Sequence, residues 1–204
     1  MLLEAKSAQL VLLDFQTAHS QALPESAALL VKAERLLKLA QLFGVPAISA
    51  QLPTELLGDF APALQQPGAR HIVRTPYSAV AMQGANILGL LEAADQSPKG
   101  SNARSLPKHL QKAAAEPRSD IVLAGWQTHG AVMQTALDLI EQEWEVCVVV
   151  DVCAARSSRD HDAALDRLAG QGVELISFEM LALEWLGDTQ HKYMAQVQAL
   201  LQAA

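Results

Sequence analysis

Cysteine is scarce in this sequence of 204 residues, which holds Cys147 and Cys153 and no other thiol. Two cysteines cannot build the disulfide framework of a small secreted protein, so we expect a reducing, cytoplasmic setting. The first fifteen residues, MLLEAKSAQLVLLDF, include an acidic residue at position 4 and lack the pattern of a cleavable signal peptide. No apolar run reaches the length of a membrane span, and we therefore expect no membrane partner.

Positive charge is also scarce. The sequence contains 15 Lys and Arg residues and 22 Asp and Glu residues, which gives a net charge of −7. The basic residues form no dense patch, which argues against a nucleic-acid partner. No His-x-His pair with a neighbouring Asp follows the second apolar run, so we expect no metal and no cofactor. Half of the residues are hydrophobic, which at this length is typical of one globular domain.

The segment 121–138, IVLAGWQTHGAVMQTALD, has the pattern of a buried strand that feeds a helix through a short turn. Such a turn directs the free N–H groups at the start of the helix toward one point, which favours an anion or a developing negative charge. In an open parallel sheet this point lies at the carboxyl ends of the strands, where ligands bind.

Apolar runs and helical periodicity alternate along the whole chain. The predicted strands are 10–15, 45–50, 71–73, 121–124, 145–151 and 173–177. The predicted helices are 24–43, 84–95, 106–115, 131–140, 157–170, 178–186 and 189–201. This alternation predicts a single α/β domain, a three-layer α/β/α sandwich around a mainly parallel six-stranded sheet.

Asp14 ends the first apolar run and has two interpretations from its position alone. It is either a loop carboxylate held by backbone N–H groups, or a general acid or base that lines the ligand crevice. Cys147 falls inside an apolar run and is interpreted as a small buried hydrophobic residue.

Four segments in this order resemble the isochorismatase-like cysteine hydrolase superfamily, in particular its isochorismatase-domain subgroup. They are LVLLDFQ at 10–16, RTPYSA at 74–79, GWQTHGAVMQTALD at 125–138 and EVCVVVDVCAARS at 145–157. The resemblance implies the family's Rossmann-like fold over nearly the whole chain, as one domain 1–204 with an insertion near 84–105.

The thiol hydrolases of that family use an Asp, a Lys and a Cys. Carried over by motif, the acid is Asp14, the lysine position holds Arg74, and the cysteine position holds Ala131. Lys99 and Lys108 are alternative sources of the missing lysine. The resemblance also implies a cis peptide bond between residues 126 and 127.

These departures change the chemistry that the site can perform. Ala131 has no nucleophile, so no covalent acyl-enzyme intermediate can form there. Arg74 stays protonated and cannot shuttle a proton as a buried lysine can, and beside Asp14 it would hold the carboxyl group ionised.

The resemblance and the strand ends suggest a set of ligand-binding residues around this site. They are Gln16, Gln51, Tyr77, Trp126, Gln127, Thr128, His129 and Gly130. Gln51 is also explained as an ordinary polar loop residue, and His129 as a capping or packing residue. Cys153 follows the fifth strand and is better explained as a packed residue than as a replacement nucleophile.

Two functions from different classes follow. The first is a hydrolase-like protein without thiol chemistry, whose activity would centre on Asp14; the family's isochorismate hydrolases, which cleave a vinyl ether, do not need the thiol. The second is a non-catalytic ligand-binding or assembly protein on the same fold.

We expect a small-molecule ligand and a homo-oligomer. The apolar face of the last helix offers a surface for the oligomer. That face contains Tyr193, Met194, Val197 and Leu200, and the alternative is that it packs on its own domain.

Overall fold

The computed structural model describes residues 2–23, 25–65, 70–81, 85–95 and 118–202. Its centre is a six-stranded sheet in the order β3-β2-β1-β4-β5-β6, and every neighbouring pair is parallel. The strands are β1 (Ala8–Leu13), β2 (Ala47–Gln51), β3 (Arg70–Val73), β4 (Asp120–Gly125), β5 (Glu145–Val149) and β6 (Glu174–Ile176). The predicted fold class and the six strands are therefore confirmed.

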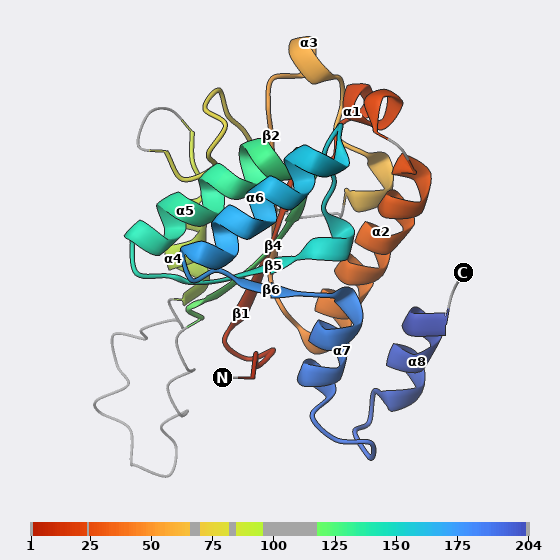
Figure 1. Ribbon diagram of the computed structural model, residues 1–204. Helices are drawn as coiled ribbons and strands as arrows, with labels where there is room; N and C mark the ends of the chain where they lie inside the picture. The colour runs from red at the N-terminus through yellow and green to blue at the C-terminus, as the bar shows by residue number, and fades with distance from the viewer. Residues whose placement is uncertain (1, 24, 66–69, 82–84, 96–117, 203–204) are drawn as a thin grey trace.

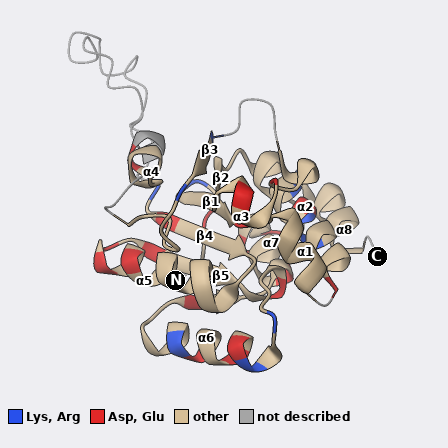
Figure 2. Ribbon diagram, turned by 90° about the horizontal axis from the view of Figure 1, so that it is seen from above, with Lys and Arg blue, Asp and Glu red and all other residues tan. Residues whose placement is uncertain are grey.

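Helices cover both faces of this sheet, as Figures 1 and 2 show. One face carries α4 (Leu88–Asp95), α5 (Met133–Glu141) and α6 (Ser158–Gly170). The other carries α2 (Ser26–Phe43), α7 (Phe178–Leu186) and α8 (Met194–Gln202). The short helix α1 (Thr17–Ala22) follows β1, and α3 (Thr54–Leu57) and the 3-10 turn η1 (Pro62–Leu64) follow β2. A second 3-10 turn, η5 (Val150–Val152), follows β5.

Several predicted boundaries need correction. The first strand ends at Leu13 because Asp14 takes a left-handed φ of 54°, which turns the chain out of the sheet. The fifth strand ends at Val149, where η5 begins, and the last helix starts at Met194 and not at residue 189. The helix predicted at 106–115 and part of the predicted insertion at 84–105 lie outside the described residues.

The central pair of strands, β1 and β4, is packed so closely that one position requires glycine. A Cβ added to Gly125 would lie 2.5 Å from the carbonyl oxygen and 2.8 Å from the Cβ of Leu13. Both strands are almost wholly buried, as expected for a parallel sheet covered on both faces. The strand order reverses between β1 and β4, and in such sheets the crevice at the carboxyl ends of these two strands is the usual ligand site.

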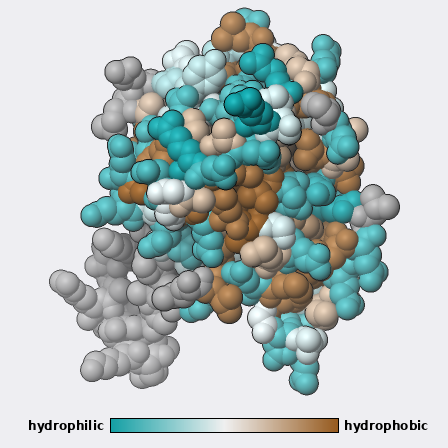
Figure 3. All heavy atoms as spheres, viewed as in Figure 1, coloured by the Kyte–Doolittle hydropathy of each residue, from teal (hydrophilic) through white to brown (hydrophobic). Residues whose placement is uncertain are grey.

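Figure 3 shows apolar residues gathered toward the middle of the viewed surface, with further apolar residues at its top edge. On α7, Met180 and Leu183 are each about half exposed. Within the described residues, no helix combines the length and the apolar character needed to cross a bilayer.

Candidate active site

Asp14 lies directly beyond the carboxyl end of β1 and is fully buried. Its backbone N–H donates to the carbonyl oxygen of Ala50 at 3.0 Å, which joins this turn to β2. The backbone N–H of Leu52 donates to Asp14 Oδ1 at 3.2 Å. The carboxylate is therefore held in place by backbone on one side, as the first interpretation of its sequence position required.

Arg74 follows β3 and brings its guanidinium group to the same carboxylate. Arg74 Nη2 lies 2.8 Å from Asp14 Oδ1 and 2.7 Å from Oδ2, and both side chains have no exposed area. Arg74 Nη1 donates to the carbonyl oxygen of Pro76 at 2.5 Å, whereas Arg74 Nε is buried without a partner among the described residues. Asp14 and Arg74, which the sequence analysis singled out together, therefore form a buried ion pair.

Burial and the contact with Arg74 have opposite effects on the pKa of Asp14. Burial raises the pKa of Asp14 from its ordinary value of 3.8 to about 6, although the charge and hydrogen bonds of Arg74 and the Leu52 N–H lower it. The carboxyl group is still mostly ionised at neutral pH, but much closer to its proton-binding range than an exposed aspartate.

The turn after β4 begins with Gln127, whose φ of 60° and ψ of 61° are left-handed. The expected cis bond between residues 126 and 127 is not present, because all described peptide bonds are trans. The chain turns instead through the backbone angles of Gln127, and the next N–H, of Thr128, donates to the carbonyl oxygen of Ala154 at 2.8 Å. A π-helical turn, η4 (Thr128–Val132), then leads into α5 and buries Ala131 completely.

Two histidines that sequence reasoning missed hold this turn. His19 on α1 has its Nε2 atom 2.7 Å from Nε2 of Gln127, and since an amide nitrogen only donates, the ring nitrogen accepts. His161 on α6 has its Nδ1 atom 2.9 Å from the hydroxyl of Thr128. Burial lowers the pKa of both histidines, with Arg156 adding to the effect at His19, so both favour the neutral form.

Two of the other predicted ligand residues, Gln16 and Gln51, hydrogen-bond to the loop after β2. Gln16 is fully buried and binds backbone on both sides of the loop after β2, donating to the carbonyl oxygens of Leu52 at 3.0 Å and Gly58 at 2.7 Å. Gln51 donates to the hydroxyl of Thr54 at 3.1 Å in the same loop. Both glutamines therefore shape the loop that lies over Asp14.

Tyr77 lies nearer to solvent, whereas most of the turn after β4 is buried. The Tyr77 side chain is 51% exposed, and its ring edge lies 3.9 Å from a Cβ built on Gly130. Trp126 is 1% exposed, packs its ring 5.2 Å from that of Phe15, and leaves its Nε1 atom unpartnered among the described residues. The Nδ1 atom of His129 is likewise buried without a partner in the described part of the chain.

Neither cysteine has the environment of a nucleophile. Burial raises the pKa of Cys153 to about 12, and burial together with nearby carboxylates raises the pKa of Cys147. Among the described residues, no group of three or more His, Cys, Asp and Glu side chains is arranged to hold a metal ion.

Comparison with known proteins agrees with this geometry. The family model of the isochorismatase domain matches residues 8–180. Isochorismatase domain-containing protein 2 of Bos taurus is 30% identical over 170 residues, which cover 83% of this chain and 71% of that protein. The chain belongs to the isochorismatase family.

Solved structures show the same family fold. The MAR1 ribonuclease of Caenorhabditis elegans superposes with a TM-score of 0.81 at 20% identity and covers 100% of this chain and 94% of its own. The ycaC gene product of Escherichia coli, an octameric hydrolase of unknown specificity, gives 0.78 at 22% identity over 98% of this chain and 88% of its own. At these identities the likeness concerns the fold alone.

Proposed function

We propose that this isochorismatase-family protein performs no thiol-dependent hydrolysis and uses the inherited crevice to bind a small molecule without covalent chemistry. The observation that carries the proposal is the fully buried ion pair in which one nitrogen of Arg74 contacts both oxygens of Asp14. Ala131 supports it, because a methyl group at the position of the family's cysteine cannot attack a carbonyl carbon.

The ion pair removes Asp14 from proton transfer in two ways. A carboxylate that accepts two hydrogen bonds from a guanidinium and one from a backbone N–H has little capacity left for a substrate. Arg74 does not take over this role, because a guanidinium group is a poorer proton carrier than a lysine amine. The pair therefore acts as a fixed, buried support beneath the proposed binding site.

One observation favours a second candidate, acid-catalysed cleavage without a thiol. Because the pKa of Asp14 is raised to about 6, a part of the molecules carries a protonated carboxyl group near neutral pH. Such a group is able to donate a proton to the carbon of an enol ether, after which water attacks the resulting cation. Isochorismate would be the substrate of this reaction.

A panel of isochorismate, small amides and N-carbamoyl compounds separates the two candidates. The binding function predicts no turnover above that of the Asp14→Asn variant, together with a thermal shift by a ligand from a wider small-molecule screen. Isochorismate cleavage that disappears in Asp14→Asn would overturn it in favour of the second candidate, provided that circular dichroism shows the variant folded.

A gain-of-function experiment tests the role of the two altered positions. We expect Ala131→Cys alone to give no amide hydrolysis, because Arg74 cannot exchange a proton with the new thiol. Adding Arg74→Lys supplies the missing proton carrier and should produce hydrolysis of a small amide or N-carbamoyl compound. Equal activity of the single and double variants would show that Arg74 is not the barrier.

We further propose a cytoplasmic protein that forms a homo-oligomer and binds no nucleic acid. The two free cysteines fit a reducing compartment, and the net charge of −7 is unfavourable for a phosphate backbone. The octameric state of the Escherichia coli relative supports self-assembly. Light scattering of the purified protein measures the oligomer size.

A further inference from the structure

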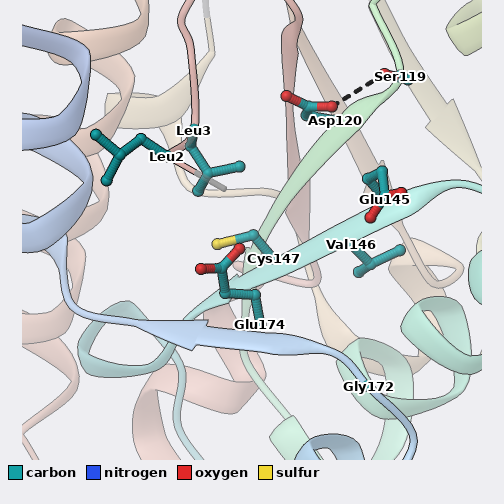
Figure 4. Close-up of a pocket in the computed structure, with 9 residues that line it drawn as sticks. All are labelled: Leu2, Leu3, Ser119, Asp120, Glu145, Val146, Cys147, Gly172 and Glu174. Carbon is teal, nitrogen blue, oxygen red and sulfur yellow. Dashed lines mark hydrogen bonds between the residues drawn. The ribbon is translucent and has the colours of Figure 1, made fainter.

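A cavity lies at the amino ends of β4, β5 and β6, the edge of the sheet opposite to Asp14. Its volume is about 330 Å³, enough for a small organic molecule. Its wall combines apolar and acidic residues, which Figure 4 shows together: Leu2, Leu3, Ser119, Asp120, Glu145, Val146, Cys147, Gly172 and Glu174. The three acidic residues each come from the first position of a different strand.

Within the part of the chain that the structure describes, no ion pair involves the three carboxylates that line this cavity. Among the described residues, neither Glu145 nor Glu174 has a hydrogen bond or ion pair, and Asp120 accepts hydrogen bonds from two serine hydroxyls, which carry no charge. A fourth carboxylate, Glu184, lies close by and accepts the backbone N–H of Leu3 at 2.8 Å. The cavity therefore presents a concentrated negative potential to solvent.

The inner part of the cavity contains a polar group without a partner. The Cys147 side chain is 1% exposed, and within the described chain its thiol makes no hydrogen bond. In Figure 4 its sulfur points, beside the carboxylate of Glu174, toward the side on which Leu2 and Leu3 lie. Glu174, Glu184 and Asp120 raise the pKa of this thiol in addition to burial, so their negative charge reaches the inner end of the cavity.

The arrangement does not suit a bare metal ion. No three acidic, cysteine or histidine side chains converge on one point within the described residues, whereas Mg²⁺ and Ca²⁺ require several oxygen ligands at short distance. The mixture of separated carboxylates and leucine and valine side chains suits a charged head attached to an apolar body.

We propose that this cavity binds an organic ammonium ion whose charged head lies among Asp120, Glu145 and Glu174 and whose apolar part packs against Leu2, Leu3 and Val146. The binding is non-covalent. It is independent of the chemistry at Asp14, because the two sites lie at opposite edges of one parallel sheet.

Titration of the full-length protein with hexylammonium chloride, followed by ¹H–¹⁵N NMR, tests the proposal. We expect saturable shifts of the amide signals of Leu3, Cys147 and Gly172, and a dissociation constant in the range of about 0.1–1 mM. The neutral analogue 1-hexanol and the bare cation Mg²⁺ should each bind the same residues at least about fivefold more weakly, since neither combines charge with an apolar body.

Matched variants test whether Glu145 and Glu174 bind the ammonium group of hexylammonium. Glu145→Gln combined with Glu174→Gln should weaken hexylammonium binding about fivefold, because exposed ion pairs are individually weak. Glu55→Gln, which changes an exposed acid on α3 at the other edge of the sheet, should leave it unchanged. Equal binding of hexanol or Mg²⁺, an unchanged affinity in the double variant, or no saturable shift would each overturn the proposal.

Discussion

Single side chains decide which reactions are open to this chain. In the proposed function, Ala131 excludes covalent catalysis at its position, since no arrangement of neighbours converts a methyl group into a nucleophile. The guanidinium of Arg74 places a positive charge beside Asp14 but is a poorer proton carrier than a lysine amine. The proposal is therefore a site that keeps a charge pair without thiol chemistry.

Arg74→Met tests how strongly the fold depends on that balance. Removing one partner leaves Asp14 buried without a counter-ion, so we expect the free energy of unfolding to fall by about 3–5 kcal/mol in urea denaturation. Arg159→Met, an exposed arginine on α6, should change it by no more than about 0.5 kcal/mol. Equal effects of the two changes would contradict a structural role of the pair.

The pKa of Asp14 is itself measurable through ¹³C NMR of the side-chain carboxyl, with Asp14→Asn to assign the signal. We expect a midpoint near pH 6. Because this folded-state pKa lies above the ordinary value of 3.8, the folded protein binds the extra proton in this window. The carboxyl group therefore contributes stability that is fully present below pH 3.8 and lost as the pH rises through 6. A midpoint near 3.8 would remove the support for acid catalysis.

At the scale of elements, the buried side-chain amide of Gln16 connects the loop after β1 to the loop after β2 by hydrogen bonds. Gln16 donates to the carbonyl oxygens of Leu52 and Gly58, and its own oxygen accepts the N–H of Leu52 at 3.0 Å. A Cβ on Gly58 would lie 2.1 Å from the hydroxyl oxygen of Thr17, so the two loops also touch directly. The hydrogen bonds of Gln16 fix the backbone N–H of Leu52, which also donates to Asp14.

Gln16→Ala should loosen this loop. The change leaves buried backbone groups without partners, and we expect a loss of about 1–3 kcal/mol in the free energy of unfolding. Hydrogen exchange at the Leu52 amide should become faster. Gln21→Ala, an exposed glutamine on α1, serves as the control and should alter neither quantity. Unchanged exchange at Leu52 in Gln16→Ala would show that other contacts hold the loop.

At the scale of the whole molecule, α8 belongs to the domain itself. Val197 has no exposed area, and Tyr193, Met194 and Leu200 are partly buried against the core. The helix contacts α2 and α7 on one face of the sheet. Much of the face considered for self-assembly is thus used within one chain, in agreement with the other interpretation of the sequence.

Val197→Asp distinguishes packing from assembly. A charge buried without a partner should lower the free energy of unfolding by more than about 3 kcal/mol, while the mass of the folded protein in light scattering stays the same. Gln196→Asp places the same charge on the exposed side of α8 and should have little effect on stability. A smaller mass with unchanged stability would instead assign α8 to an oligomer interface.

The sequence by itself determined the strands and the parallel layers, because continuous apolar runs alternate with helical periodicity and few folds bury both patterns. It also placed Asp14 at a strand end and showed that residue 131 cannot be a nucleophile, since these are properties of single positions. Local turn geometry was less accessible. The bond between residues 126 and 127 is trans because the backbone of Gln127 takes the turn, which its residue type does not reveal.

The tertiary structure decided the contacts within the site. The family resemblance suggested that Arg74 lies beside Asp14, 60 positions away, but the contact between His19 and Gln127, which are 108 positions apart, had no signal in the sequence. Such pairs depend on how neighbouring strands and their loops are brought together, which no local pattern encodes. The pKa of Asp14 follows from the same cause, because burial in the assembled sheet raises it against the charge of its partner.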